Sequence, residues 1–225
     1  MTKANKTYAQ QFQDTFKTLC RTRNHWQAWS DFILMSACSI SNAVDKDMFV
    51  QREEMYMQAT KKYTTDELES IAQLFAFTAL ALEENPDQDF LGDIFNTLKL
   101  YNEHKGQFFT PYNVAKMMAR MLYGNLAAEI KEKGSVSVAD CCCGAGGLLI
   151  AVANAAREQS VNYQRDVYFV AQDIDFVVAM SCFIQLSLLG CRGHVIVGNS
   201  LAPEPPQREN IWHMPMNAIQ NLLGG

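Results

Sequence analysis

The sequence predicts an α/β fold in which a mostly parallel sheet follows an all-helical N-terminal region. Three observations support this prediction. Apolar residues recur at helical spacing in the first part of the chain, helix and strand patterns alternate later on, and a glycine-rich segment separates a strand from a helix. We therefore expect a helical region at residues 1–101 and a second domain at residues 102–225.

The helical region starts with apolar residues at helical spacing: Tyr8, Phe12, Phe16, Leu19, Trp26, Trp29 and Ile33. Thr64 and Glu67 form a capping-box pattern, which predicts the start of another helix. Asn85-Pro86-Asp87 ends that helix, because the residue before a proline avoids the helical conformation. A short helix is then expected over 90–101.

After residue 102 the predicted elements alternate between helices and strands. The expected helices cover 111–123, 147–157 and 176–189, and the expected strands cover 136–139, 167–171 and 194–197. Alternation of this kind is typical of parallel strands joined by crossover helices.

The composition excludes several classes of protein. Hydrophobic residues make up 48% of the chain, which favours a folded core over disorder. The formal net charge of −5 disfavours tight binding to a phosphate backbone without a partner. No segment has the pattern of a signal peptide or a membrane span. Seven cysteines, three of them adjacent, suit neither a disulfide framework nor a metal site, and we expect a reducing cytoplasm.

The segment Asp140-Cys141-Cys142-Cys143-Gly144-Ala145-Gly146-Gly147 lies between the first predicted strand and its helix. Glycines let a backbone approach a ligand closely, and the new helix offers free N–H groups. The segment therefore predicts a site for a nucleotide-like cofactor. A dinucleotide site prefers G-x-G-x-x-G, and here the third spaced glycine is missing, which favours S-adenosylmethionine over a dinucleotide.

Polar residues also follow the second and third predicted strands. Asp173 is placed to accept hydrogen bonds from ribose hydroxyls, although either Asp173 or Asp175 could instead cap the next helix. We favour Asp175 as the cap and Asp173 as the ligand-binding residue. Asn199 could meet an adenine edge or could be an ordinary turn residue.

A second motif, Gly106-Gln107-Phe108-Phe109-Thr110-Pro111, precedes the helix that leads into the sheet. Thr110 suits an N-cap and Pro111 a first helical position. Together with the glycine turn and with Asp89-Phe90-Leu91-Gly92-Asp93-Ile94-Phe95, it resembles adenine-specific DNA methyltransferases, the modification subunits of type I restriction-modification systems. The resemblance covers Asp89 to Ser200.

This resemblance implies a Rossmann-like fold that binds S-adenosylmethionine without a metal and methylates the exocyclic amino group of an adenine flipped out of DNA. Thr110 would contact the methionine carboxylate, Asp173 the ribose, and Asn199 the adenine. The cofactor-binding residues that it implies are Gly106, Gln107, Phe108, Phe109, Thr110, Pro111, Asp140, Cys143, Gly144, Ala145, Gly146, Gln172, Asp173 and Asn199. Family members also work with a separate specificity subunit.

One departure from the family concerns catalysis. The family needs a [DN]-P-P-[FYW] tetrapeptide after a fourth strand, which holds the target amino group and stacks on the base. The sequence has only Glu204-Pro205-Pro206-Gln207, so we assign no catalytic residue. Three hypotheses stay open: an adenine DNA methyltransferase, a catalytically incompetent cofactor-binding module that acts through a partner, and a methyltransferase for another substrate. A specificity-type subunit or a second copy of the chain is the expected partner. A Rossmann oxidoreductase would leave the second motif unexplained.

Overall fold

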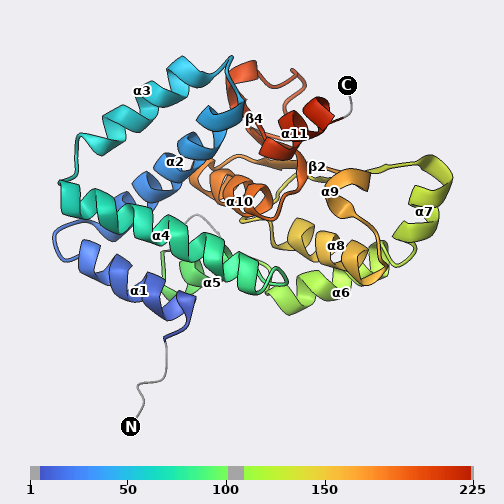
Figure 1. The fold of residues 1–225 in the computed structure, drawn as a ribbon, viewed down its shortest axis with the longest axis horizontal. Helices are drawn as coiled ribbons and strands as arrows, with labels where there is room; N and C mark the ends of the chain where they lie inside the picture. The colour runs from blue at the N-terminus through green and yellow to red at the C-terminus, as the bar shows by residue number, and fades with distance from the viewer. Residues whose placement is uncertain (1–5, 101–108, 224–225) are drawn as a thin grey trace, which may run out of the picture.

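The fold is taken from a computed structural model of the chain, which describes residues 6–100 and 109–223. The prediction of an α/β fold with a helical start is confirmed (Figure 1). No described helix is both long and apolar enough to cross a bilayer.

Helices precede the sheet along the chain. They are α1 (Tyr8–Leu19), α2 (His25–Val44), α3 (Phe49–Thr60), α4 (Thr65–Glu84), α5 (Phe90–Thr97), α6 (Tyr112–Leu122) and α7 (Leu126–Lys133). The predicted capping box forms, since the Thr64 hydroxyl accepts the Glu67 N–H and the Glu67 carboxylate accepts the Thr64 N–H. Helix α4 ends at Glu84, directly before Asn85-Pro86, as predicted.

The sheet contains four strands in the order β1-β2-β3-β4. Its elements are β1 (Val136–Asp140), α8 (Gly147–Glu158), α9 (Tyr163–Asp166), β2 (Val167–Asp173), α10 (Phe176–Leu188), β3 (Arg192–Val197), β4 (Ile211–His213) and α11 (Pro215–Leu223). β1, β2 and β3 run parallel, while β4 pairs antiparallel with β3. The C-terminal part therefore covers the β3 edge, and β1 has no neighbour on its other side among the described strands.

The two faces of the sheet differ in burial. Helices α8 and α10 contact each other and the strands that they connect, so they lie on one face. Phe169 and Ala171 point to that face and are fully buried. Tyr168 and Val170, which alternate with them along β2, are only half-buried. A parallel sheet usually has both faces covered, and the described residues cover mainly one.

The helical region packs against α10 and joins the same hydrophobic core as the sheet. A buried cation strengthens this junction. The Arg52 guanidinium of α3 lies 4.0 Å from the Trp212 ring centre on β4, and it donates hydrogen bonds to Asp45 Oδ2 and to the Ile211 carbonyl, both at 2.8 Å. The helical region therefore holds the last strand of the sheet in place.

Several element bounds differ from the prediction. Helix α5 ends at Thr97 rather than near residue 101, because Lys99 takes a left-handed φ of 53°. Pro111, not Thr110, is the N-cap of α6, so the Thr110 side chain is not engaged as a helix cap. The prediction omitted α7, α9, β4 and α11, which lack a strong periodic pattern or are short.

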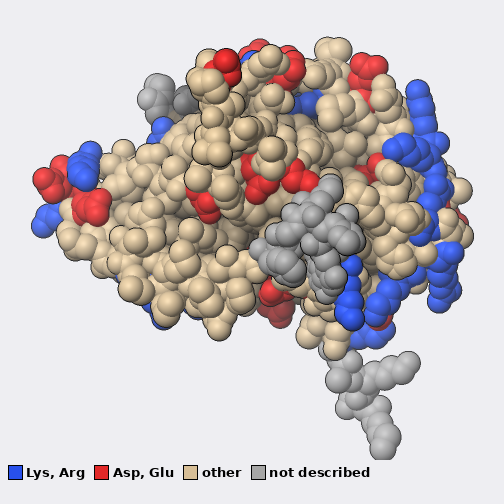
Figure 2. Space-filling model, turned by 180° about the vertical axis from the view of Figure 1, so that it is seen from behind, with Lys and Arg blue, Asp and Glu red and all other residues tan. Residues whose placement is uncertain are grey.

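Charge is unevenly distributed on the surface that Figure 2 displays. Lys and Arg gather along the right-hand edge, which corresponds to the helical region in Figure 1. Asp and Glu lie near the centre of this view and also at several places along its outline. The exposed cations of the helical region include Lys17, Arg21, Lys61 and Lys62.

Candidate cofactor-binding site

The glycine turn connects β1 to α8 and adopts a shape that only glycine accepts easily. Gly144 has a φ of 56° and Gly146 a φ of 96°, both in the left-handed region. A Cβ at Gly146 would lie 2.9 Å from the Cys182 sulfur, and one at Gly144 would lie 3.2 Å from the Phe109 ring. The backbone of the turn therefore lies directly against its protein neighbours, and its close approach to a ligand stays a prediction.

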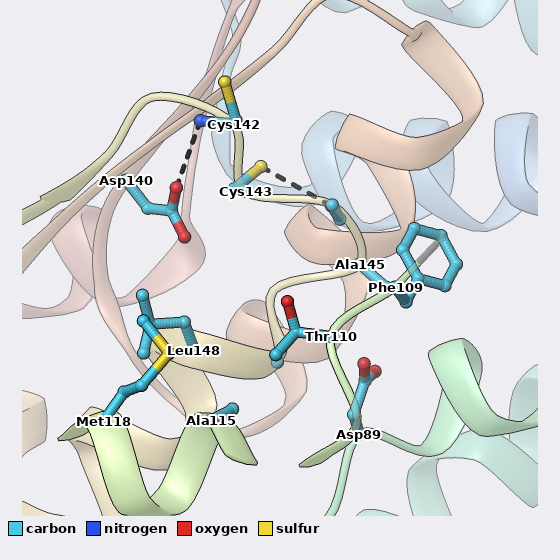
Figure 3. Close-up of a pocket in the computed structure, with 12 residues that line it drawn as sticks. Asp89, Phe109, Thr110, Ala115, Met118, Asp140, Cys142, Cys143, Ala145 and Leu148 are labelled. Carbon is cyan, nitrogen blue, oxygen red and sulfur yellow. Dashed lines mark hydrogen bonds between the residues drawn. The ribbon is translucent and has the colours of Figure 1, made fainter. Parts of the chain in front are cut away.

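A cavity of about 240 Å³ opens beside this turn (Figure 3). Its walls come from the turn, from the start of α8, from α6 and the residues before it, and from Asp89. The lining residues are Asp89, Phe109, Thr110, Ala115, Met118, Asp140, Cys142, Cys143, Gly144, Ala145, Gly147 and Leu148. The structure thus brings Thr110 and the turn, which are far apart in sequence, to one pocket.

Asp140 ends β1 at the rim of this pocket. Its Oδ1 accepts the Cys142 N–H at 3.1 Å, as the dashed line in Figure 3 marks. Burial raises the pKa of Asp140, with a further contribution from the nearby Asp173 charge. The described residues donate no hydrogen bond to the second oxygen of Asp140. This oxygen can therefore accept one from a ligand amine or hydroxyl.

Asp173 ends β2, two residues beyond Ala171, which is the β2 partner of Asp140. Its Oδ2 accepts the Gly144 N–H at 3.1 Å and its Oδ1 accepts the Asp175 N–H at 3.0 Å. Asp175 caps α10 by accepting the Val177 N–H, so the prediction that Asp175 is the helix cap is confirmed. Asp173 therefore supports the turn itself, and its contact with a ribose stays a prediction.

The other predicted nucleoside-side residues lie outside the cavity walls. Gln172 Nε2 donates to the Gly198 carbonyl at 3.3 Å, joining the ends of β2 and β3. Asn199 is exposed, and its Oδ1 accepts the Leu201 N–H at 3.0 Å, as in an ordinary asparagine turn. Both residues still lie at the carboxyl edge of the sheet, where an adenosine would extend from the pocket.

The remaining predicted cofactor-binding residues differ in whether they are described and whether they line the pocket. Gly106, Gln107 and Phe108 lie outside the described residues. Phe109 packs against Phe95 with tilted rings whose centres lie 5.0 Å apart, and it lines the pocket. Pro111 and Gly146 shape the chain beside the pocket without lining it.

Sequence reasoning did not assign the remaining lining residues to the site. Ala115 and Met118 share one face of α6, three residues apart, so they could have been inferred once Thr110 was placed at the pocket. Asp89 belonged to the Asp89–Phe95 motif but was given no role. The sequence feature that could have pointed to Asp89 is the glycine three residues later. In the structure, a Cβ at Gly92 would lie 2.2 Å from Asp89 Oδ2, so only glycine leaves room for this carboxylate.

The donor set of the site fits an organic cofactor. Within residues 6–100 and 109–223, no cluster of three or more His, Cys, Asp or Glu side chains is arranged to hold a metal ion. The pocket instead offers a hydroxyl, carboxylates and apolar walls, and its volume is below the range of about 300–1,000 Å³ typical of whole-ligand sites. The cavity would therefore hold part of such a ligand rather than the whole of it.

The chain was compared with known proteins and with protein families. A search of curated proteins found no match. A solved structure from Listeria monocytogenes, of a protein provisionally assigned to the class I S-adenosylmethionine-dependent methyltransferases, aligns with a TM-score of 0.43 and 16% identity. The alignment covers 81% of this chain and 56% of that one, so the chain spans little more than half of its length. The family model for N-6 DNA methylases matches residues 86–220, more than half of the chain. The chain therefore belongs to the N-6 DNA methylase family, whose cofactor is S-adenosylmethionine.

Proposed function

We propose that this chain is the S-adenosylmethionine-binding component of a restriction-modification enzyme that methylates the exocyclic amino group of adenine in DNA. One observation carries the proposal: Thr110 and the glycine turn, the two motifs shared with the family, line the same pocket. When bound, the cofactor supplies the methyl group. The residues of this chain bind and orient it, with Thr110 at the methionine carboxylate, Asp173 at the ribose and Asn199 at the adenine.

Cofactor binding can be tested without catalysis. S-adenosylmethionine should raise the melting temperature of the chain, because a ligand that binds only the folded state stabilises it. Asp173→Asn should weaken binding about 10- to 100-fold, since a hydrogen bond to a charged group contributes roughly 1.5–3 kcal/mol. Calorimetry with each variant measures this change.

Comparison of Asp173→Asn with Asp173→Ala shows whether Asp173 acts on the ribose or only on the turn. Asp173→Asn keeps an oxygen that can accept the Gly144 N–H, whereas Asp173→Ala removes both turn contacts. Glu129→Gln, on α7 and away from the pocket walls, is the matched control and should bind as the wild type does. Wild-type affinity in Asp173→Asn would remove the ribose role.

The missing tetrapeptide favours a second candidate, in which the chain is a cofactor-binding module that completes its chemistry with a partner. Two features of the sheet support such a partner. β1, which leads directly into the cofactor turn, is an edge strand among the described strands. The face of the sheet away from α8 and α10 is only half-buried at Tyr168 and Val170. Unpaired edges and uncovered parallel sheets are surfaces that proteins normally cover.

We propose a partner that pairs with β1 and carries the catalytic tetrapeptide, either a separate methylase chain or an assembly with a specificity subunit.

The chain alone should therefore transfer little methyl label from the cofactor to adenine-containing DNA. Its binding to DNA should also be weak and should fall steeply with salt, because the net charge is −5 and the Lys and Arg side chains lie away from the acidic centre in Figure 2. Filter assays of labelled DNA and fluorescence anisotropy measure the two quantities. Efficient transfer by the chain alone would exclude the partner model, and transfer to RNA or protein instead of DNA would favour the third hypothesis.

A further inference from the structure

Asp89 is a buried carboxylate at the pocket that none of the assigned roles uses. The residue is 4% exposed, yet it contributes to the pocket wall. Asp89 lies in the helical region and is the residue directly before α5. Figure 3 shows its carboxylate pointing up towards the glycine turn, beside Thr110. A buried carboxylate is costly unless it is paired with a cation or fully hydrogen-bonded.

The contacts of Asp89 satisfy only one of its two oxygens. Oδ1 accepts the Gly92 N–H at 3.0 Å and the Gln185 Nε2–H at 2.8 Å. The described residues donate no hydrogen bond to Oδ2, and none of their ion pairs involves Asp89. A carboxylate that served only as a helix cap would need one oxygen, so the second one is available to a ligand.

The surroundings hold this second oxygen against the turn. An added Cβ at Gly147 would lie 3.0 Å from Asp89 Oδ2, which places that oxygen at the start of α8. Gln185 of α10 fixes the arrangement, because its Nε2 also donates to the Ala145 carbonyl at 2.9 Å and its Oε1 accepts the Leu91 N–H at 3.0 Å. Asp89 is thus rigidly positioned by both the helical region and the turn.

We infer that Asp89 binds the α-ammonium group of S-adenosylmethionine, as a cofactor-binding residue contributed by the helical region. The inference rests on the proposed cofactor geometry, in which Thr110 meets the methionine carboxylate. The ammonium and the carboxylate of methionine are bonded to the same carbon, so an acceptor beside Thr110 meets the ammonium. The ammonium group would be the cationic partner that Asp89 lacks in the protein alone, and the two would form a charge-assisted hydrogen bond.

The electrostatics of the pocket agree with a cationic ligand. Burial raises the pKa of Asp89 to about 6, and the nearby Asp93 charge adds to the effect. The other titratable groups around it are Cys182 and Tyr112, whose pKa values are raised, and Asp140 in the turn. None of these groups is a cation. A bound ammonium would lower the pKa of Asp89, so binding near pH 6 should release a proton, and the affinity should fall as the pH drops below about 6.

The test compares ligands that differ in their charged groups, measured by calorimetry on the full chain. Asp89→Asn keeps the oxygen that accepts the Gly92 N–H but removes the charge. It should bind S-adenosylmethionine and S-adenosylhomocysteine about 10- to 100-fold more weakly, because both carry the ammonium. Binding of 5′-methylthioadenosine, which has no amino-acid group, should not change. Glu129→Gln, on α7 and away from the pocket walls, is the control and should bind all three ligands as the wild type does.

The possible outcomes distinguish failure of the proposed cofactor binding from failure of the role of Asp89. If the wild-type chain binds none of the three ligands, the proposed function itself fails. If the wild type binds but Asp89→Asn binds equally well, only the role of Asp89 fails. A loss confined to S-adenosylmethionine would assign Asp89 to the sulfonium instead. Proton release near pH 6, measured in two buffers of different ionisation enthalpy, should occur in the wild type and disappear in Asp89→Asn, and its persistence there would also overturn the inference.

Discussion

Gly193→Ala should lower the free energy of unfolding by about 3–5 kcal/mol, because two costs combine at this position. Gly193 has a φ of 144°, where an L side chain is strained, and an added Cβ would lie 1.8 Å from the Phe169 carbonyl oxygen. Phe169 is the β2 partner of Gly193, so the collision is between backbone and side chain within the sheet. The two strands could relieve it only by separating.

The same glycine also joins the C-terminal part to the sheet. Its carbonyl accepts the Met214 N–H at 3.0 Å and the Asn217 Nδ2–H at 2.7 Å, and its N–H is donated to Asn217 Oδ1 at 3.0 Å. Urea denaturation followed by circular dichroism measures the loss. Gly134→Ala is the control, because Gly134 also has a positive φ of 81° but nothing lies within 4 Å of its added Cβ. That control should cost only about 1 kcal/mol. Equal stability of the two variants would show that the close approach at Gly193 does not matter.

Arg52→Met should destabilise the protein by about 3 kcal/mol, as expected when one partner of a buried ion pair is removed. Arg52 is 1% exposed and donates to Asp45, to Ser41 and to the Ile211 carbonyl. Methionine keeps the aliphatic stem of the side chain, so the change isolates the guanidinium group. Its loss should loosen β4 from the helical region.

Arg208→Met is the matched control for this charge cluster. Arg208 also pairs with Asp45, at 2.8 Å, but its side chain is 42% exposed. An exposed pair contributes about 0–1 kcal/mol, so this variant should lose much less stability than Arg52→Met. Burial acts to raise the pKa of Asp45, but hydrogen bonds from Arg208 and Arg52 outweigh burial and lower it. Chemical denaturation of both variants at neutral pH gives the comparison, and a larger loss in Arg208→Met would contradict this account.

Local patterns allowed much of the fold to be predicted. The capping box at Thr64, the stop at Asn85-Pro86 and the glycine turn after β1 depend on residues close together in the chain, and all three form. The short elements could not be predicted in this way. β4 has three residues and is a strand because β3 offers it an edge and Arg52 and the aromatic residues hold Trp212.

In the candidate site, too, some features follow from local sequence and others depend on tertiary packing. The sequence by itself determined the two motifs, the family resemblance and the choice of S-adenosylmethionine, because glycines and caps act through their own backbone. Only the tertiary structure decided which residues share a pocket. It separates the predicted residues that line the cavity, such as Thr110 and Gly144, from Gln172, Asp173 and Asn199, which lie at the sheet edge. It also brings Asp89 from the helical region to the turn, because Gln185 bridges the two. Contacts of this kind depend on packing between distant segments, and local sequence patterns do not encode which distant segment will lie alongside.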